Sequence, residues 1–250
     1  MRPLGNATRI QSGVVSQFWR TAMKRYVEKA LGAAALGLVL VWAVSMSSGR
    51  EHASDSNGGW HDEESLVRLG LEIAPVPLNL TGKNRHLVGL GSYIVNAHAA
   101  CNDCHSPGPA VEYVNGGNPY FGQPKKVNPD VYLGGGQDFG PLIPGSAHII
   151  SRNLTPDKTG RPEGGRSFAE FRRILKYGID LDGLHPPCPN GVVNESCIPA
   201  PFDGNLLQIM TWPALQNMTD HDIEAIYEYL SAIPCIAGPP APSPLHNDCE

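Results

Sequence analysis

Basic residues are scarce beyond the first fifty positions of this 250-residue chain. The whole sequence has 19 Lys and Arg against 24 Asp and Glu, and residues 51–250 hold 12 of the basic residues but 23 of the acidic ones. Proteins that bind nucleic acid need a basic face for the phosphates, so this composition argues against nucleic acid as a partner. An acidic surface instead favours protein partners with a basic patch, because complementary charge raises the rate of encounter.

Internal repeats are also absent, as is the alternation of apolar and polar residues that predicts β-strands. Apolar residues with helical spacing occur in three segments. The first begins at His86 and ends at a cysteine motif, the second covers about 167–177, and the third begins at Thr219 and ends before Pro234. Three main helices joined by long loops predict an all-α fold.

Two of these helices carry recognisable ends. Ser167 is a suitable N-cap, Glu170 completes a capping box three residues later, and Gly178 is a typical residue to end the helix. Met218 directly precedes the N-cap Thr219, where its side chain is expected to pack on the next helix as a hydrophobic staple. The first helix places its apolar residues on one face: Leu87, Leu90, Gly91, Ile94, Val95 and His98.

Charge is missing altogether from residues 30–49, an apolar run about as long as one bilayer span. The basic leader 1–29 lies on its N-terminal side, so the positive-inside rule predicts a cytoplasmic leader and an exported remainder. Two interpretations stay open: 30–49 is an uncleaved membrane anchor, or translation begins at Met23 and the run is the apolar part of a cleaved signal. In both, the body lies in the periplasm, and the polar segment 50–82 is expected to be a tether.

Long helices are excluded from residues 106–166, which contain 12 Gly and 9 Pro. A loop of this length inside a domain usually serves a function. Three helices also provide a small apolar core for the rest of the chain. An enclosed cofactor would explain both features.

The motif Cys101-Asn102-Asp103-Cys104-His105 supplies such a cofactor site. Two thiols three residues apart lie on neighbouring positions of a helical turn, where both can form thioethers with the vinyl groups of a porphyrin. His105 can then ligate the iron. With 6 Cys and 9 His in the chain, chance predicts about 0.005 occurrences of C-x-x-C-H. The sequence therefore predicts one covalently attached haem c.

Two other uses of these cysteines are less well supported. A zinc site needs four ligands, and the sequence has no second close pair of Cys or His. A thioredoxin-like redox site needs a βαβ context, which the sequence does not offer. Haem attachment remains the best interpretation of Cys101 and Cys104.

The second axial position of the iron has several candidates. Of the five methionines, three lie within the first fifty residues and Met218 has the packing role described above. Met210 stands in a loop without such a role and is the expected ligand, while His148 and His185 are alternatives. A Met/His pair of ligands raises the reduction potential.

Residues 88–233 resemble the class I cytochrome c domains of bacterial membrane-bound dehydrogenase cytochrome subunits. The resemblance rests on the segments 91–95 (GSYIV), 151–157 (SRNLTPD), 167–183, and 210–230 from Met210 to Leu230. It implies a class I cytochrome c fold over about 83–234, with His105 and Met210 on opposite haem faces. It also implies electron transfer between redox proteins, with a membrane dehydrogenase or respiratory complex as partner. The sequence departs from the family at Thr211, where a proline is frequent, and in the long stretch 185–205.

Besides an electron carrier, the sequence leaves two other classes of haem protein open, an enzyme and a sensor. A haem peroxidase or a gas sensor would need an open or labile sixth position on the iron. Met210 as a ligand would close that position, so it counts against both functions. The chain itself is therefore expected not to be an enzyme. It is expected to be either a free electron carrier or a subunit of a larger complex.

Four cysteines remain, and an exported protein keeps its disulfides. Four cysteines allow three pairings. The simplest pairs Cys188 with Cys197, and Cys235 with Cys249, which would pin the Pro-rich tail 235–250. The alternative is that some of them are free buried thiols.

Overall fold

The computed structural model describes residues 58–241 and 243–250, which belong to a single unit, Ser56–Glu250. The predictions for the leader 1–29 and the apolar run 30–49 lie outside the described residues. In the part that is described, no helix combines the length and the apolarity that a bilayer crossing requires.

The first predicted helix is confirmed as α3, Arg85–Tyr93, and it continues as the π-helical turn η1, Ile94–His98. The Oδ1 atom of Asn84 caps α3 by accepting from the backbone N–H of His86 at 3.0 Å. A π-helical turn is wider than an α-helical one and often occurs at functional sites. His98, which was expected on the apolar face, ends this turn and is exposed.

The other two predicted helices are also present. Helix α6 covers Phe168–Tyr177 and ends at Gly178, whose φ is +65°. Helix α8 covers Asp220–Leu230, and each of the two begins with a capping box, at Ser167 and Thr219 respectively. Helix α8 ends before Pro234 as predicted, since Pro234 has no N–H to donate to the Leu230 carbonyl; beyond the helix, the carbonyl of Ala232 accepts from the backbone N–H of Asn79 at 2.8 Å.

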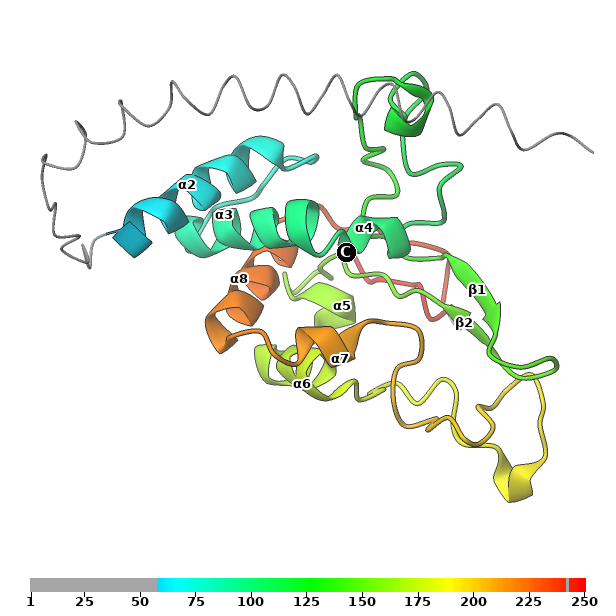
Figure 1. Cartoon of the computed structure of the whole chain (residues 1–250). Coiled ribbons are helices and arrows are strands. Elements are labelled where there is room, and N and C mark those ends of the chain that lie inside the picture. The colour runs from blue at the N-terminus through cyan, green and yellow to red at the C-terminus, as the bar shows by residue number, and fades with distance from the viewer. Residues whose placement is uncertain (1–57, 242) are drawn as a thin grey trace, which may run out of the picture. The chain divides into compact units, whose positions relative to one another are not determined.

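A further helix, α2 (Gly58–Ile73), lies where the sequence predicted a tether. It packs along α3 (Figure 1). A Cβ atom on Gly70 would lie only 1.9 Å from the carbonyl oxygen of Gly89, and the Ser92 hydroxyl donates to the Gly70 carbonyl at 2.6 Å. The tether predicted for 50–82 is therefore a packed helix over 58–73. Its apolar stripe is short and surrounded by charge, so the pattern did not indicate burial.

Helices α3 and α8 cross at Gly91, where a Cβ atom would lie 1.9 Å from the carbonyl oxygen of Ala225. A buried polar network braces this crossing. The hydroxyls of Tyr132 and Tyr229 lie 2.8 Å apart, and the amide of Asn96 donates to Tyr229 at 3.1 Å. Around it lies the main core, which includes Val67, Leu87, Val88, Leu90, Ile94, Val95, Leu133, Phe171, Leu175, Ile223, Ile226, Leu230 and Ile233.

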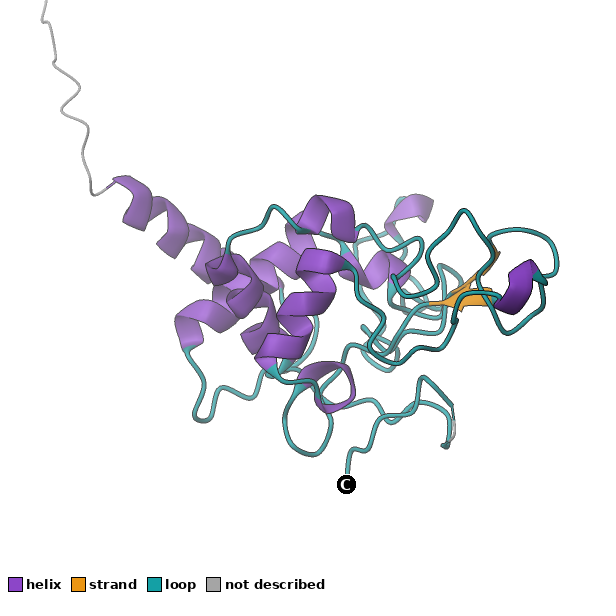
Figure 2. Cartoon of the chain, turned by 90° about the horizontal axis from the view of Figure 1, so that it is seen from below, coloured by secondary structure: helices purple, strands orange, loops and turns teal. Residues whose placement is uncertain are grey.

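The long loops contain a two-stranded antiparallel sheet that the sequence did not predict. Strand β1, Asp138–Pro141, pairs with β2, His148–Ile150. Figure 2 shows the longer helices gathered on one side and this sheet on the other, with a short helical turn beside the sheet. Strands of three and four residues are too short to show an alternating pattern. The secondary structure is thus not purely helical, and the class I cytochrome c fold stays a prediction. The shorter elements are α4 (Cys101–Cys104), η2 (Pro119–Phe121), α5 (Pro162–Gly165), η3 (Pro189–Gly191) and α7 (Trp212–Leu215).

Both predicted cysteine pairs are present as disulfides, Cys188–Cys197 and Cys235–Cys249. The second disulfide closes the C-terminal tail. Within this tail, the buried Asn247 amide donates to the carbonyls of Thr155 and Pro156, at 2.9 Å each. The tail therefore lies against the segment 151–157.

Candidate cofactor site

The cysteine motif folds as one helical turn. Ala100 precedes it in the left-handed region, with φ +47°, and this turns the chain from η1 into α4. The Asn102 side chain between the two cysteines is buried: its Oδ1 accepts from the Leu133 backbone N–H at 2.9 Å, and its amide donates to Glu112 at 3.2 Å. The motif is thereby fixed to the body while Cys101 and Cys104 both border a cavity.

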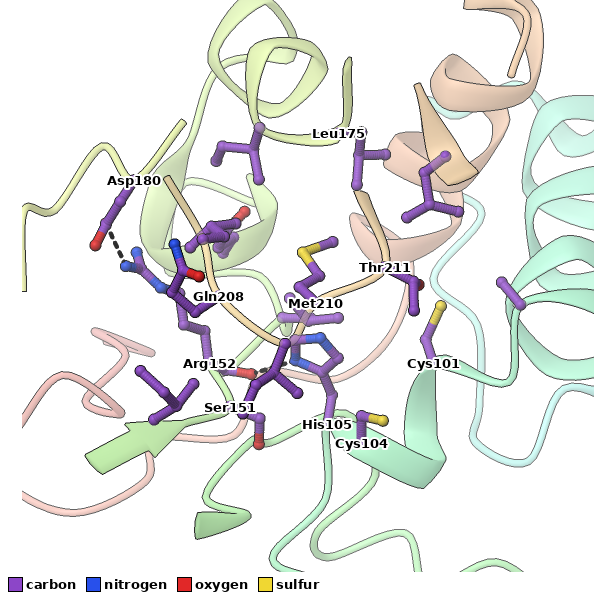
Figure 3. Close-up of a pocket in the computed structure, with 18 of the residues that line it drawn as sticks. Cys101, Cys104, His105, Ser151, Arg152, Leu175, Asp180, Gln208, Met210 and Thr211 are labelled. Carbon is purple, nitrogen blue, oxygen red and sulfur yellow. Dashed lines mark hydrogen bonds and ion pairs between the residues drawn. The ribbon is translucent and has the colours of Figure 1, made fainter. Parts of the chain in front are cut away.

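His105 follows directly and points into the same cavity (Figure 3). Its Nδ1 atom lies 2.8 Å from the carbonyl oxygen of Arg152. A carbonyl can only accept, so Nδ1 carries the proton and Nε2 keeps the free lone pair. Burial lowers the pKa of His105, which favours the neutral imidazole. A neutral imidazole with a fixed tautomer is the form that ligates metals.

The two motif cysteines remain unpaired. Burial raises the pKa of Cys101 to about 12, and burial together with the charges of Asp103 and Glu112 raises the pKa of Cys104. Thiol–disulfide exchange needs a thiol with a lowered pKa, so these two are poorly suited to a redox C-x-x-C site. Nor do any three His, Cys, Asp or Glu side chains of residues 58–241 and 243–250 gather as a metal site.

The cavity has a volume of about 480 Å³, within the range of cofactor pockets. Its wall is mainly apolar and comes from segments far apart in the sequence. The apolar part includes Phe139, Ile149, Leu154, Phe171, Ile174, Leu175, Leu207, Leu215, Ile226 and Leu230. Among the described residues of the wall, the acidic and strongly basic ones are Arg152, Glu163 and Asp180.

Met210 reaches the cavity from the loop before α7 (Figure 3). The backbone N–H of Met210 donates to the Gln208 carbonyl at 2.7 Å, which forms a tight turn with Ile209 at φ +67°. A positive φ is strained for a β-branched residue, and such strain is common at functional sites. The turn is held by the Trp212 indole N–H, which donates to the Leu207 carbonyl at 3.1 Å.

The alternative ligands divide into two groups. Met218 does not border the cavity, and it packs against the main core as predicted for it. His148 is exposed on β2, with its Nδ1 atom 2.8 Å from Asp138. His185 does line the cavity, half-buried, so the structure brings it together with His105 and Met210. Of the four candidates, Met210 and His185 therefore line the same cavity as His105.

Three charged residues of the wall were not assigned a role by the sequence. The side chain of Arg152 is only 12% exposed, and it forms an ion pair with Asp180. Glu163 is buried with φ +50°, and burial raises its pKa to about 7, opposed by the charges of Arg152 and Arg166. Arg152 lies within 151–157, one of the segments that carry the family resemblance. That segment was therefore the sequence signal that could have pointed to Arg152. No pattern indicated Glu163.

The residues of this cavity fit a haem. Two neutral thiols, an imidazole with a fixed tautomer and a thioether converge on one apolar chamber. No protein-family model matches the chain, and comparisons with curated proteins and with solved structures found no similar protein. The assignment of this site therefore depends on the motif and on the geometry.

Proposed function

We propose that this protein is a monohaem c-type cytochrome that carries single electrons between redox proteins. The observation that carries the proposal is the convergence of Cys101, Cys104, His105 and Met210 on one apolar cavity, although more than a hundred residues separate the motif from Met210. A zinc site or a redox C-x-x-C would not need the apolar wall or the thioether. A buried haem needs the apolar wall and can use the thioether as an iron ligand.

Each residue has a distinct role in this proposal. The thiols of Cys101 and Cys104 would each add across one vinyl group, with the sulfur bonding to one carbon and the proton passing to the other. His105 Nε2 and Met210 Sδ would ligate the iron, which supplies a one-electron couple. The apolar wall excludes water, and Arg152 would oppose the negative charge of the porphyrin carboxylates.

Location and partners follow from the sequence. We propose that the body lies in the periplasm at the bacterial inner membrane, held by residues 30–49 or released by their cleavage. Its redox partner would be a protein with a basic patch, such as a membrane dehydrogenase or a respiratory complex, because the body is acidic. The protein itself would catalyse no reaction on a small substrate.

Covalent haem attachment tests the proposal directly. The chain would be produced together with a cytochrome c maturation system, and haem measured by mass and by visible absorption after extraction with acidified acetone. We expect one haem that resists extraction in the wild type. Cys101→Ser with Cys104→Ser should lose it, whereas Cys188→Ser with Cys197→Ser should keep it. A wild-type chain without covalent haem under these conditions would refute the proposal.

The same preparation separates a carrier from a haem enzyme or gas sensor. A carrier with Met ligation should show a weak absorption band at the red end of the oxidised spectrum and should not bind carbon monoxide when reduced. Rapid carbon monoxide binding by the wild type would favour the enzyme or sensor instead.

A further inference from the structure

The loop between α4 and β1 ends in two exposed aromatic side chains. Tyr120 and Phe121 are 79% and 76% exposed, the largest values among the large hydrophobic residues that the structure describes. They stand on η2, at the tip of the green loop that projects beyond α4 in Figure 1. Adjacent exposed aromatic rings on a surface usually mark an interaction site.

The backbone below these rings is well ordered by hydrogen bonds. The Asn118 side chain accepts from the Tyr120 backbone N–H at 2.9 Å, and the Gln123 side chain accepts from the Asn118 backbone N–H at 3.0 Å. Further down, the backbone N–H of Lys126 donates to the Gly117 carbonyl at 2.9 Å. The loop is therefore built to hold the two rings in solvent rather than to fold them against the body.

The charge around the tip is opposite to that of the body. Residues 113–129 contain Lys125 and Lys126, both exposed, and no acidic residue. The nearest acidic residues along the chain are Glu112, which is buried at the base of the loop, and Asp130 beyond its other end. Aromatic rings beside lysines suit a membrane interface, where the rings lie among the headgroups and the ammonium groups meet anionic phosphates.

Two observations favour a lipid surface over a redox partner. None of residues 106–138 lines the cavity, so a protein that docked on the tip would not thereby touch the cofactor site. In addition, only residues 50–57 separate the apolar run 30–49 from the start of α2. A chain of this length spans at most about 28 Å, which would keep an anchored body close to the bilayer.

We propose that this aromatic tip, formed by Tyr120, Phe121, Lys125 and Lys126, docks on the surface of a membrane that contains anionic lipid. The proposal does not depend on haem attachment. It assigns to the loop a function separate from electron transfer: it would fix how the anchored body is oriented above the membrane.

Photocrosslinking of the full-length chain tests this proposal. The photoreactive residue p-benzoylphenylalanine would replace Phe121, or Tyr177 on α6 as an exposed aromatic control. The protein would be reconstituted into phosphatidylcholine vesicles with or without phosphatidylglycerol. We expect several-fold more lipid adducts at 121 than at 177, and fewer at 121 when phosphatidylglycerol is omitted. Lys125→Gln with Lys126→Gln should lower the yield at 121 towards that at 177.

Other outcomes would overturn the proposal. Equal lipid labelling at 121 and 177 would show that the tip has no preference for the bilayer. The labelling at 121 could also stay the same in the Lys125→Gln, Lys126→Gln variant and without phosphatidylglycerol. This result would exclude an anionic lipid surface as the partner. A protein adduct instead of lipid adducts at 121 in native membranes would assign the tip to a protein interface. Equal thermal unfolding temperatures of all variants would exclude misfolding as a cause.

Discussion

The Nδ1 atom of His105 lies 2.8 Å from the carbonyl oxygen of Arg152, a residue 47 positions further along the chain. This contact fixes the ring of His105 and leaves Nε2 free for a metal. The carbonyl is itself held in place, because the neighbouring Asn153 side chain donates to the carbonyls of Ile236 at 2.8 Å and Leu245 at 3.2 Å. The C-terminal tail thus supports the cofactor site without lining it.

The second axial ligand can be identified with three single variants. Met210→Ala should open the sixth position, lower the reduction potential and let carbon monoxide bind the reduced protein, because the soft thioether that favours ferrous iron is lost. Haem should stay attached through Cys101 and Cys104. His185→Ala should leave the red-end band in place, and so should Met218→Ala, which serves as the packing control. A wild type that lacks the red-end band, and carbon monoxide binding that is opened by His185→Ala but not by Met210→Ala, would assign the ligand to His185.

Glu163 should make the stability of the protein depend on pH. Its pKa rises from 4.5 to about 7 on folding, so the folded state holds a proton that the unfolded state has released between these values. The contribution of Glu163 to stability is then greatest below pH 4.5 and is lost as the pH rises from there through about 7. One pKa unit corresponds to about 1.4 kcal/mol, which gives a loss of roughly 3 kcal/mol.

Urea unfolding at pH 5 and pH 8 checks this prediction. The variant Glu163→Gln should lose most of the difference between the two pH values, whereas Glu224→Gln, exposed on α8, should retain it. An unchanged pH dependence in Glu163→Gln would show that another group is responsible.

The disulfide Cys235–Cys249 in the tail should affect the reduction potential of the site more than the disulfide Cys188–Cys197 does. Replacing Cys235 and Cys249 by Ser should cost roughly 3 kcal/mol of unfolding free energy and shift the reduction potential, since the tail holds the segment that carries the Arg152 carbonyl. Replacing Cys188 and Cys197 by Ser should cost roughly 2–3 kcal/mol with little change in potential. Equal shifts in potential would contradict this division. Alkylation of the wild type without reductant should label none of the four.

Gly70 should be sensitive to substitution if α2 belongs to the folded body. A Cβ atom would lie 1.9 Å from the Gly89 carbonyl, so Gly70→Ala should separate α2 from α3 and cost about 1–3 kcal/mol or more. Leu69→Ala, on the exposed side of α2, should cost well under 1 kcal/mol. Chemical denaturation measures both, and a harmless Gly70→Ala would mean that the two helices do not pack closely.

The topology of the chain can be tested with a reporter fused after Glu250. Because the basic leader precedes the apolar run 30–49, the reporter should be active only outside the cytoplasm. Cytoplasmic activity would contradict the predicted export. Sequencing the N-terminus of the mature protein decides between the anchor and the cleaved signal.

The sequence by itself determined the local features of this protein. The capping boxes at Ser167 and Thr219, the stop at Gly178 and the apolar stripes predicted three helices, because these signals act within a few residues. The spacing of Cys101, Cys104 and His105 is an equally local signal, and the haem chemistry that it predicts stays a prediction. Both disulfide pairs also joined cysteines close in sequence, which made the simplest pairing the right one.

Only the tertiary structure decided which distant residues meet. It placed Met210 and His185 in the cavity and kept Met218 and His148 outside it, set the Arg152 carbonyl on His105, and brought Glu163 into an apolar wall. It also packed α2 against α3 through Gly70, where the absence of a side chain leaves no apolar signal to read. These contacts depend on the path of long Gly- and Pro-rich loops, and a loop path is determined by the surfaces it crosses rather than by a pattern within its own sequence.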